Sequence, residues 1–228
     1  MTSRQKAALE LALFMAAFFF VWTIRATSLY VIDESIGSPT LRALYANVLK
    51  MFLWVVPAAA FALWRKGQQP AKYLGLSVTP SWKQWKTCLV ATFAFLLAVM
   101  AFEAIVGGRV ISFQHRLSTT PLIGLLSFLF SPLLEEILFR GLVMKELSAL
   151  SPLAVANILT SLLFAAVHLP YWLSHGGYTP TMAANVFGVF LFSLLAGWVF
   201  AKSGSIWPPT LAHVLNNIVS SLLVTRQA

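Results

Sequence analysis

Residues 131–141 read Ser-Pro-Leu-Leu-Glu-Glu-Ile-Leu-Phe-Arg-Gly, which places two acids and one base within an otherwise apolar segment. Charged side chains in hydrocarbon are costly and persist where they face a partner or a wet cavity. On a helix, Glu136 and Arg140 are four residues apart and share one face, which predicts a buried ion pair. Glu135 points about 100° away. This carboxylate is therefore predicted to be available for chemistry, and a low-dielectric pocket makes it a stronger base than it is in water.

The composition around this stretch is that of an integral membrane protein. Of 228 residues, 59% are apolar and only 10% are charged, whereas soluble domains have about 25% charged residues. The net charge of +9 comes from basic residues that lie mostly at segment ends. The positive-inside bias and anionic lipid explain them better than nucleic acid, which we exclude as a partner. We predict a single integral membrane domain, residues 1–228.

Apolar stretches of about 20 residues, enough to cross a bilayer, occur at six places. They cover residues 8–29, 43–64, 86–106, 152–170, 182–201 and 207–225. A seventh region, 118–150, is too long for one simple span, and Ser131-Pro132 predicts a break with a new helix starting near Leu133. We predict an all-α, polytopic transmembrane helix bundle around a buried polar catalytic cavity. It would have seven helices, or eight if 118–130 forms a separate piece.

Basic residues also predict the orientation of the bundle. The connection 65–86 carries five Lys or Arg residues, and Arg4 and Lys6 lie on the same side two spans earlier. The positive-inside bias places this side in the cytoplasm, so we predict a multi-pass protein of the cell membrane with a cytoplasmic N-terminus. Lys50, inside the span 43–64, is expected to extend its ammonium group to the interface.

Two histidines occur in similar apolar settings. Phe164 and His168 are four residues apart near the end of the span 152–170. If helices on either side of residue 150 form a hairpin, Glu135 and His168 lie at similar depths and face each other. A histidine at a helix end is also a common interfacial residue, and this alternative remains open.

His213 and Asn217 share a helix face just after Trp207-Pro208-Pro209, where proline favours the start of a helix. The alternative is that they only join helices by polar contacts. His213 lies about 9 Å beyond Trp207, whereas Glu135 and His168 lie about 22–27 Å from the turn near residue 150. These groups meet only if the loop 202–209 dips into the bundle, or if 118–130 adds a crossing.

The three clusters, Glu-Glu-x-x-x-Arg, Phe-x-x-x-His and His-x-x-x-Asn, resemble in this order the motifs of the CPBP family, the CAAX proteases and bacteriocin-processing enzymes, also called the Abi family. The resemblance covers about residues 120–220, which would be the catalytic core. It implies an intramembrane endopeptidase of the CAAX type. Its partners would be the lipid bilayer and a membrane-associated protein or peptide substrate, with or without a prenyl group.

The resemblance also implies a role for each residue. Glu135 and His168 would hold and activate the attacking water, and His213 and Asn217 would stabilise the tetrahedral oxyanion. Supporting roles fall to Glu136 and Arg140, which would orient the site, and to Phe164.

The family chemistry leaves two versions open. In the zinc version, Glu135, His168 and His213 would be the three ligands, with water in the fourth position. We prefer the version without a cofactor, because it alone gives Asn217 a role. Two other functions compete with proteolysis: a catalytically idle immunity or scaffold protein, and a small transporter that uses Glu135 and His168 as a proton relay.

Overall fold

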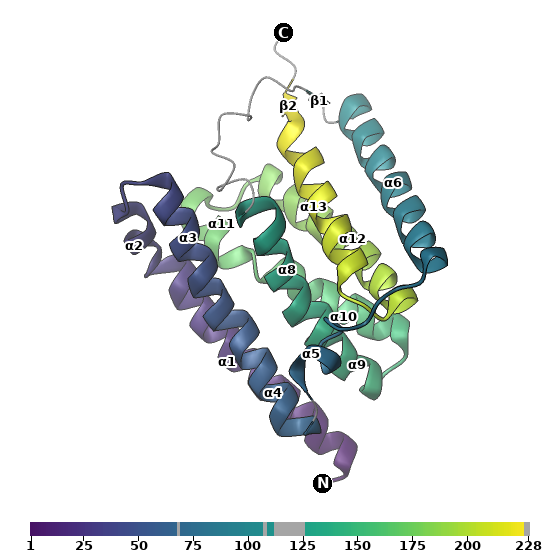
Figure 1. Cartoon of the computed structure of the whole chain (residues 1–228). Helices are drawn as coiled ribbons and strands as arrows, with labels where there is room; N and C mark the ends of the chain where they lie inside the picture. The colour runs from purple at the N-terminus through teal and green to yellow at the C-terminus, as the bar shows by residue number, and fades with distance from the viewer. Residues whose placement is uncertain (68, 107–108, 112–125, 226–228) are drawn as a thin grey trace.

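The computed structural model describes residues 1–67, 69–106, 109–111 and 126–225, and these residues form a bundle of helices (Figure 1). The N-terminal helices are α1 (Ser3–Thr27), α2 (Tyr30–Ser35), α3 (Pro39–Lys50), η1 (Met51–Val55), α4 (Val56–Lys66), α5 (Pro70–Tyr73) and α6 (Trp82–Ile105). The C-terminal helices are η2 (Leu126–Phe130), α8 (Ser131–Glu136), η3 (Ile137–Met144), α9 (Lys145–Leu150), α10 (Leu153–Ala166), α11 (Leu169–Gly176), α12 (Pro180–Ser203) and α13 (Trp207–Leu222). Two short strands, β1 (Arg109–Ile111) and β2 (Leu223–Thr225), pair antiparallel. The predicted all-α fold is confirmed.

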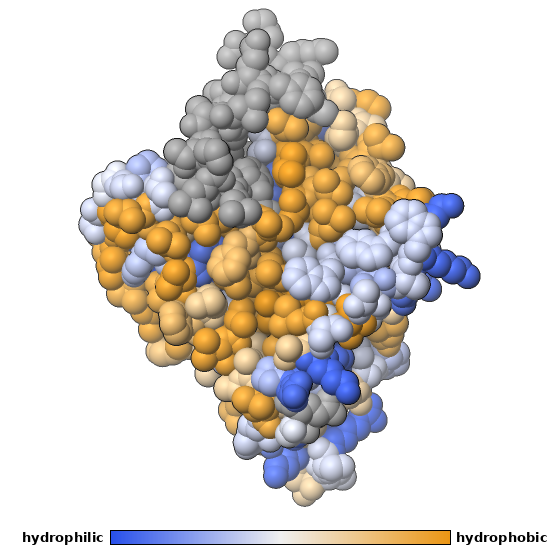
Figure 2. Space-filling view, viewed as in Figure 1, coloured by the Kyte–Doolittle hydropathy of each residue, from blue (hydrophilic) through white to orange (hydrophobic). Residues whose placement is uncertain are grey.

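Five helical stretches in the described part of the chain are long and apolar enough to cross a membrane. They are Ser3–Ser35, Pro39–Arg65, Trp82–Ile105, Leu153–Gly176 and Met182–Ser203. Figure 2 shows apolar residues over most of the visible face, with hydrophilic residues gathered toward the end that carries the N-terminus and α5. The protein is therefore a multi-pass membrane protein. The possible eighth helix was predicted at 118–130, of which 118–125 lie outside the described residues.

The predicted helix break at Ser131-Pro132 is wrong. Backbone angles remain helical at Phe130, and the chain runs without interruption from η2 through α8, η3 and α9. η2 is a π-helical segment that ends just before Pro132, and η1, another, ends just before Pro57. The wider π turn gives the proline ring the space that an α turn denies it, and π turns often occur at functional sites.

The continuous helix 126–150 is the centre of the bundle. All eight residues of η3 are buried, and η3 packs on α10, α4 and α12. Aromatic rings continue this core edge to face from Phe18 of α1 through Trp54 and Phe139 to Phe164 of α10, with centroids 5.0 to 5.8 Å apart. Such pairs add about 0.5–1.5 kcal/mol each beyond the area they bury. The core therefore fixes η3 relative to α1, η1 and α10.

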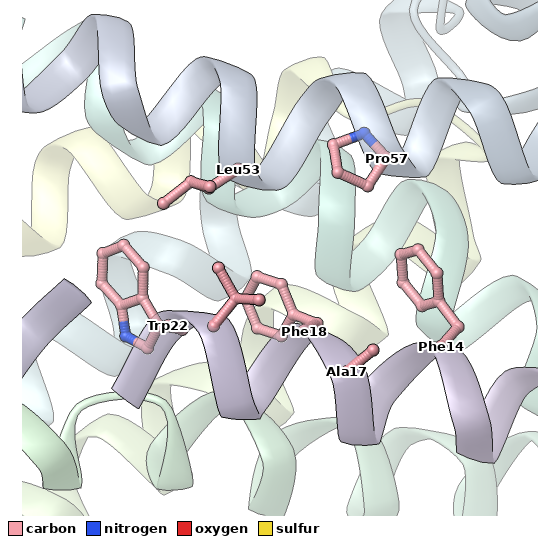
Figure 3. Close-up of a pocket in the computed structure, with 7 residues that line it drawn as sticks. Phe14, Ala17, Phe18, Trp22, Leu53 and Pro57 are labelled. Carbon is pink, nitrogen blue, oxygen red and sulfur yellow. The ribbon is translucent and has the colours of Figure 1, made fainter. Parts of the chain in front are cut away.

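The packing of α1 on η1 and α4 is less tight. An apolar cavity of about 250 Å³ separates them, and Figure 3 shows side chains of α1 pointing across it toward Leu53 and Pro57. The side chains from α1 are those of Phe14, Ala17, Phe18, Val21 and Trp22. An apolar lining of this kind is typical of a cavity that binds no polar ligand.

The loop between α12 and α13 is buried in the protein. Ser205 and Ile206 are fully covered, and the Ile206 amide donates to the Gly75 carbonyl at 3.4 Å. Ser205 Oγ donates to the Val78 carbonyl at 2.7 Å, and the Trp207 indole donates to the Leu76 carbonyl at 2.9 Å. The start of α13 is thus covered by the connection 70–78. This burial agrees with the first of the two alternatives by which His213 was expected to reach Glu135, whereas most of the segment in the second, 118–130, lies outside the described residues.

A close approach between α10 and α12 gives a first prediction. The Asn157 amide group donates to the Leu194 carbonyl at 3.0 Å, and a methyl group at Gly197 would overlap Asn157 Oδ1. Gly197→Ala is expected to lower the free energy of unfolding by about 1–3 kcal/mol, because Asn157 must leave its partner or the helices must separate. Thermal unfolding in detergent micelles measures this loss. Gly188→Ala, on the same helix but facing open space, is the matched control. Equal melting of both variants would contradict the prediction.

Candidate active site

The structure contains the predicted ion pair between Glu136 and Arg140. Both side chains are fully buried, and Arg140 Nη1 donates to Glu136 Oε1 at 3.0 Å. Arg140 Nη2 also donates to the carbonyl and the hydroxyl of Ser193 on α12, at 3.0 and 2.7 Å. The guanidinium group lies 4.6 Å from the ring centre of Phe164, which places this aromatic ring against the buried ion pair. Ser193 was missed by the sequence analysis, because nothing local links it to Arg140.

His213 lies between the two acids. Its Nδ1 is 2.9 Å from Glu136 Oε1 and its Nε2 is 3.8 Å from Glu135 Oε2. A carboxylate oxygen only accepts, so we assign the hydrogen of this bond to Nδ1. Nε2 is therefore the atom that faces Glu135. Asn217 lies one turn farther along α13, partly exposed, and makes no side-chain hydrogen bond to another described residue.

His168 lies at the junction of α10 and α11, where its Nδ1 is 2.9 Å from the Phe164 carbonyl. A carbonyl accepts, so Nδ1 donates, and in the neutral ring Nε2 keeps a free lone pair. His168 and Glu135 line the same polar cavity of about 190 Å³. Its other lining residues are Trp22, Arg25, Ala26, Tyr30, Asp33, Lys50, Trp54, Val167, Tyr171 and Trp172. The predicted hairpin thus brings Glu135 and His168 to one cavity.

Glu135 is not the unpaired acid that the sequence predicted. Lys50 Nζ donates to Glu135 Oε1, and it also contacts Ser131 Oγ at 2.7 Å. The expectation that Lys50 extends to the interface is therefore wrong, because α3 packs against α8 and a carboxylate is within its reach. The second oxygen, Glu135 Oε2, is buried and makes no hydrogen bond to a described residue. The carboxylate has one bound and one available oxygen.

The arrangement does not fit the zinc version of the site. Among the described residues, no three His, Cys, Asp or Glu side chains are placed to hold a metal ion. Glu135 also contacts the ammonium group of Lys50, a cation that would lie beside a bound metal ion. A catalytic zinc ion requires three converging ligands at about 2.0–2.2 Å. The set Glu135, His168 and His213 does not provide this convergence in the structure.

Comparison with known proteins gives one match. Residues 117–219 match the family described as Rce1-like, type II CAAX prenyl endopeptidase Rce1-like. No match was found among curated proteins. The matched segment includes all three sequence motifs, every described helix from η2 to α12 and residues 207–219 of α13, whereas Lys50 lies outside it.

Proposed function

Because residues 117–219 match the family of type II CAAX prenyl endopeptidases, we propose that the chain is a CAAX-type membrane protease of the CPBP family and that it hydrolyses a peptide bond at Glu135 without a metal ion. The observation that carries this proposal is the oxygen Glu135 Oε2. It is buried, has no hydrogen-bond partner among the described residues and faces His213 Nε2. A carboxylate oxygen of this kind accepts a hydrogen bond from a water molecule and then its proton.

The proposed reaction assigns a step to each of the four residues. Water held between Glu135 Oε2 and His168 Nε2 loses a proton to this pair, and its oxygen attacks the peptide carbonyl carbon. The carbonyl oxygen becomes an oxyanion, to which Asn217 and His213 Nε2–H donate. The proton then moves to the peptide nitrogen, the C–N bond breaks, and an amine and a carboxylic acid leave.

His213 acts in this scheme through Glu136. Because Nδ1 donates to Glu136, an Nε2–H donor requires the doubly protonated ring. Glu136 holds the ring with Nε2 toward the cavity, and Arg140 holds Glu136. We therefore assign Glu136 and Arg140 as positioning residues, because they act through His213 and not on the substrate.

An apolar cavity supports a substrate with a membrane-embedded part. The cavity has a volume of about 760 Å³ and lies between α3, the start of helix 126–150 and α13. Its lining includes Leu133, two residues before Glu135, and Thr210, three residues before His213. A long hydrocarbon group such as a prenyl chain fits this size and chemistry. The cell membrane location and the cytoplasmic N-terminus remain predictions from the positive-inside bias.

A comparison of protein termini tests the proposal. Host membranes carrying wild type, Glu135→Gln or Glu34→Gln at equal abundance are analysed by mass spectrometry for new termini. Glu34 is an exposed acid of α2 and serves as the control. Termini common to wild type and Glu34→Gln but absent from Glu135→Gln are expected, and they identify the substrate and bond. Identical termini in all three would favour the scaffold or transporter function.

A further inference from the structure

We propose that Lys50 is the built-in counter-cation of Glu135: it holds one carboxylate oxygen, leaves the other for the attacking water and takes the place of a metal ion. This inference rests on the proposed function and deepens it. Lys50 lies outside the segment that matches the protease family. It is a positioning residue, since it acts on the substrate only through Glu135.

The contacts of Lys50 define a built site. The side chains of Lys50 and Glu135 are only 12% and 11% exposed, and they form an ion pair. The same ammonium group contacts Ser131 Oγ at 2.7 Å and lies 4.5 Å from the ring centre of Trp54. Lys50 therefore contacts a carboxylate, a hydroxyl and an aromatic face. Each of these partners stabilises a cation that is shielded from water.

Local helix geometry explains how these groups meet. Lys50 ends α3 and Trp54 follows four residues later in η1, so both lie on one face. Ser131 and Glu135 have the same spacing on α8. α3 and η1 both pack on α8, which brings the two faces together. Lys50 directly precedes the π-helical segment η1, and Glu135 lies in α8 between the π-helical segments η2 and η3.

Charge balance in the cavity requires such a cation. Arg140 binds Glu136 and Ser193, and Arg25 pairs with Asp33, which also lines the cavity. Among the described residues, Lys50 is the Lys or Arg side chain that contacts Glu135, and His213 Nε2 lies 3.8 Å from the other carboxylate oxygen. A buried carboxylate without a partner favours its neutral form, which is useless as a base.

The same contact argues against two other chemistries. A divalent cation on Glu135 would lie beside the Lys50 ammonium group, and like charges at such distances repel strongly in a low dielectric. A serine nucleophile at Ser131 would need Lys50 as its base, whereas Lys50 Nζ already donates to the Glu135 carboxylate. Lys50 therefore favours hydrolysis by water at Glu135.

Three variants test the role of Lys50 in the full-length protein. Lys50→Met removes the charge and is expected to lower kcat by about 100-fold with KM within about threefold, as for loss of an interaction that acts on the chemical step. Lys50→Arg keeps the charge and should retain at least a tenth of the wild-type kcat. The control Arg65→Met removes a cation of α4 that pairs with Glu10 and lies 4.0 Å from Glu146; none of these three residues lines the polar cavity, so this variant should keep the wild-type activity.

Amine rescue separates charge from packing. Lys50→Ala leaves space for propylammonium, which should restore at least a tenth of the wild-type kcat to this variant and none to Glu135→Gln. A folded Lys50→Met with wild-type kcat, or Lys50→Ala without rescue, would overturn the inference. If either of these results were found and Glu135→Gln were inactive, the proposed function would hold without the role of Lys50. An inactive wild type would instead count against the proposed function.

Metal content gives a measurement that needs no variant. Wild type equilibrated with zinc and then desalted is expected to hold well below one zinc ion per chain, and chelators should leave its kcat unchanged. If Lys50→Met fails to fold, the zinc content of wild type and the kcat of Lys50→Arg still test the proposed role of Lys50. One tightly held zinc ion per wild-type chain, whose removal abolishes cleavage, would overturn both the counter-cation role and the metal-free mechanism.

Discussion

Replacing Glu135 with glutamine is expected to lower kcat by about 10²–10⁴-fold, the range for loss of a general base. Glutamine keeps the size of the side chain, and its Oε1 still accepts from Lys50, so the fold should survive. Its NH₂ group replaces Oε2 and accepts no proton from water. Peptide cleavage by purified protein in proteoliposomes measures the loss, with far-UV circular dichroism and thermal melting as checks of folding.

The partner residues provide the control for this prediction. His168→Ala should lose activity to a similar extent, and the double variant should lose no more than either single variant, because the two side chains act on one water molecule. Asn217→Ala removes an oxyanion donor, which is worth roughly 3–4 kcal/mol of barrier. Additive losses in the double variant, or cleavage by Glu135→Gln at the wild-type rate, would disprove the assignment of the base.

Local spacing predicted the parts of the site that lie on one helix or on the two helices of one hairpin. The pair Glu136–Arg140 follows from two residues four apart on a helix, and the shared depth of Glu135 and His168 follows from a hairpin about residue 150. These inferences need only the rise and the period of an α-helix. They hold even though η3 is a π-helix, because Glu136 precedes it by one residue and Arg140 lies in its first half.

Long-range contacts could not be predicted in the same way. Lys50 reaches Glu135 across 85 residues, His213 reaches Glu136 across 77, and Arg140 reaches Ser193 across 53. Each contact depends on how two helices pack, which a single sequence does not specify. The continuous helix through Pro132 was missed for a different reason. Proline predicts an interrupted α-helix, but the π turn before it keeps the chain helical.

Arg140→Ala is expected to lower the free energy of unfolding by about 3–5 kcal/mol, the cost of leaving a buried charge without its partner. Of its donors among the described residues, Glu136 would keep His213 alone, and Ser193 would lose the guanidinium that binds its hydroxyl and carbonyl. Chemical unfolding in micelles, followed by tryptophan fluorescence, measures the change. A variant as stable as wild type would show that the Glu136–Arg140 pair contributes nothing to the stability of the fold.

A compensating variant then separates stability from orientation. Glu136→Gln combined with Arg140→Met removes both charges and keeps similar volumes, so most of the lost stability should return, as for other buried ion pairs replaced by uncharged residues. The glutamine still accepts from His213 Nδ1, but it no longer offers a negative charge to a doubly protonated ring. Activity should therefore stay low in a protein of nearly wild-type stability. Recovery of both stability and activity would mean that the buried pair only stabilises the helices. It would also mean that His213 needs no carboxylate to act on the oxyanion.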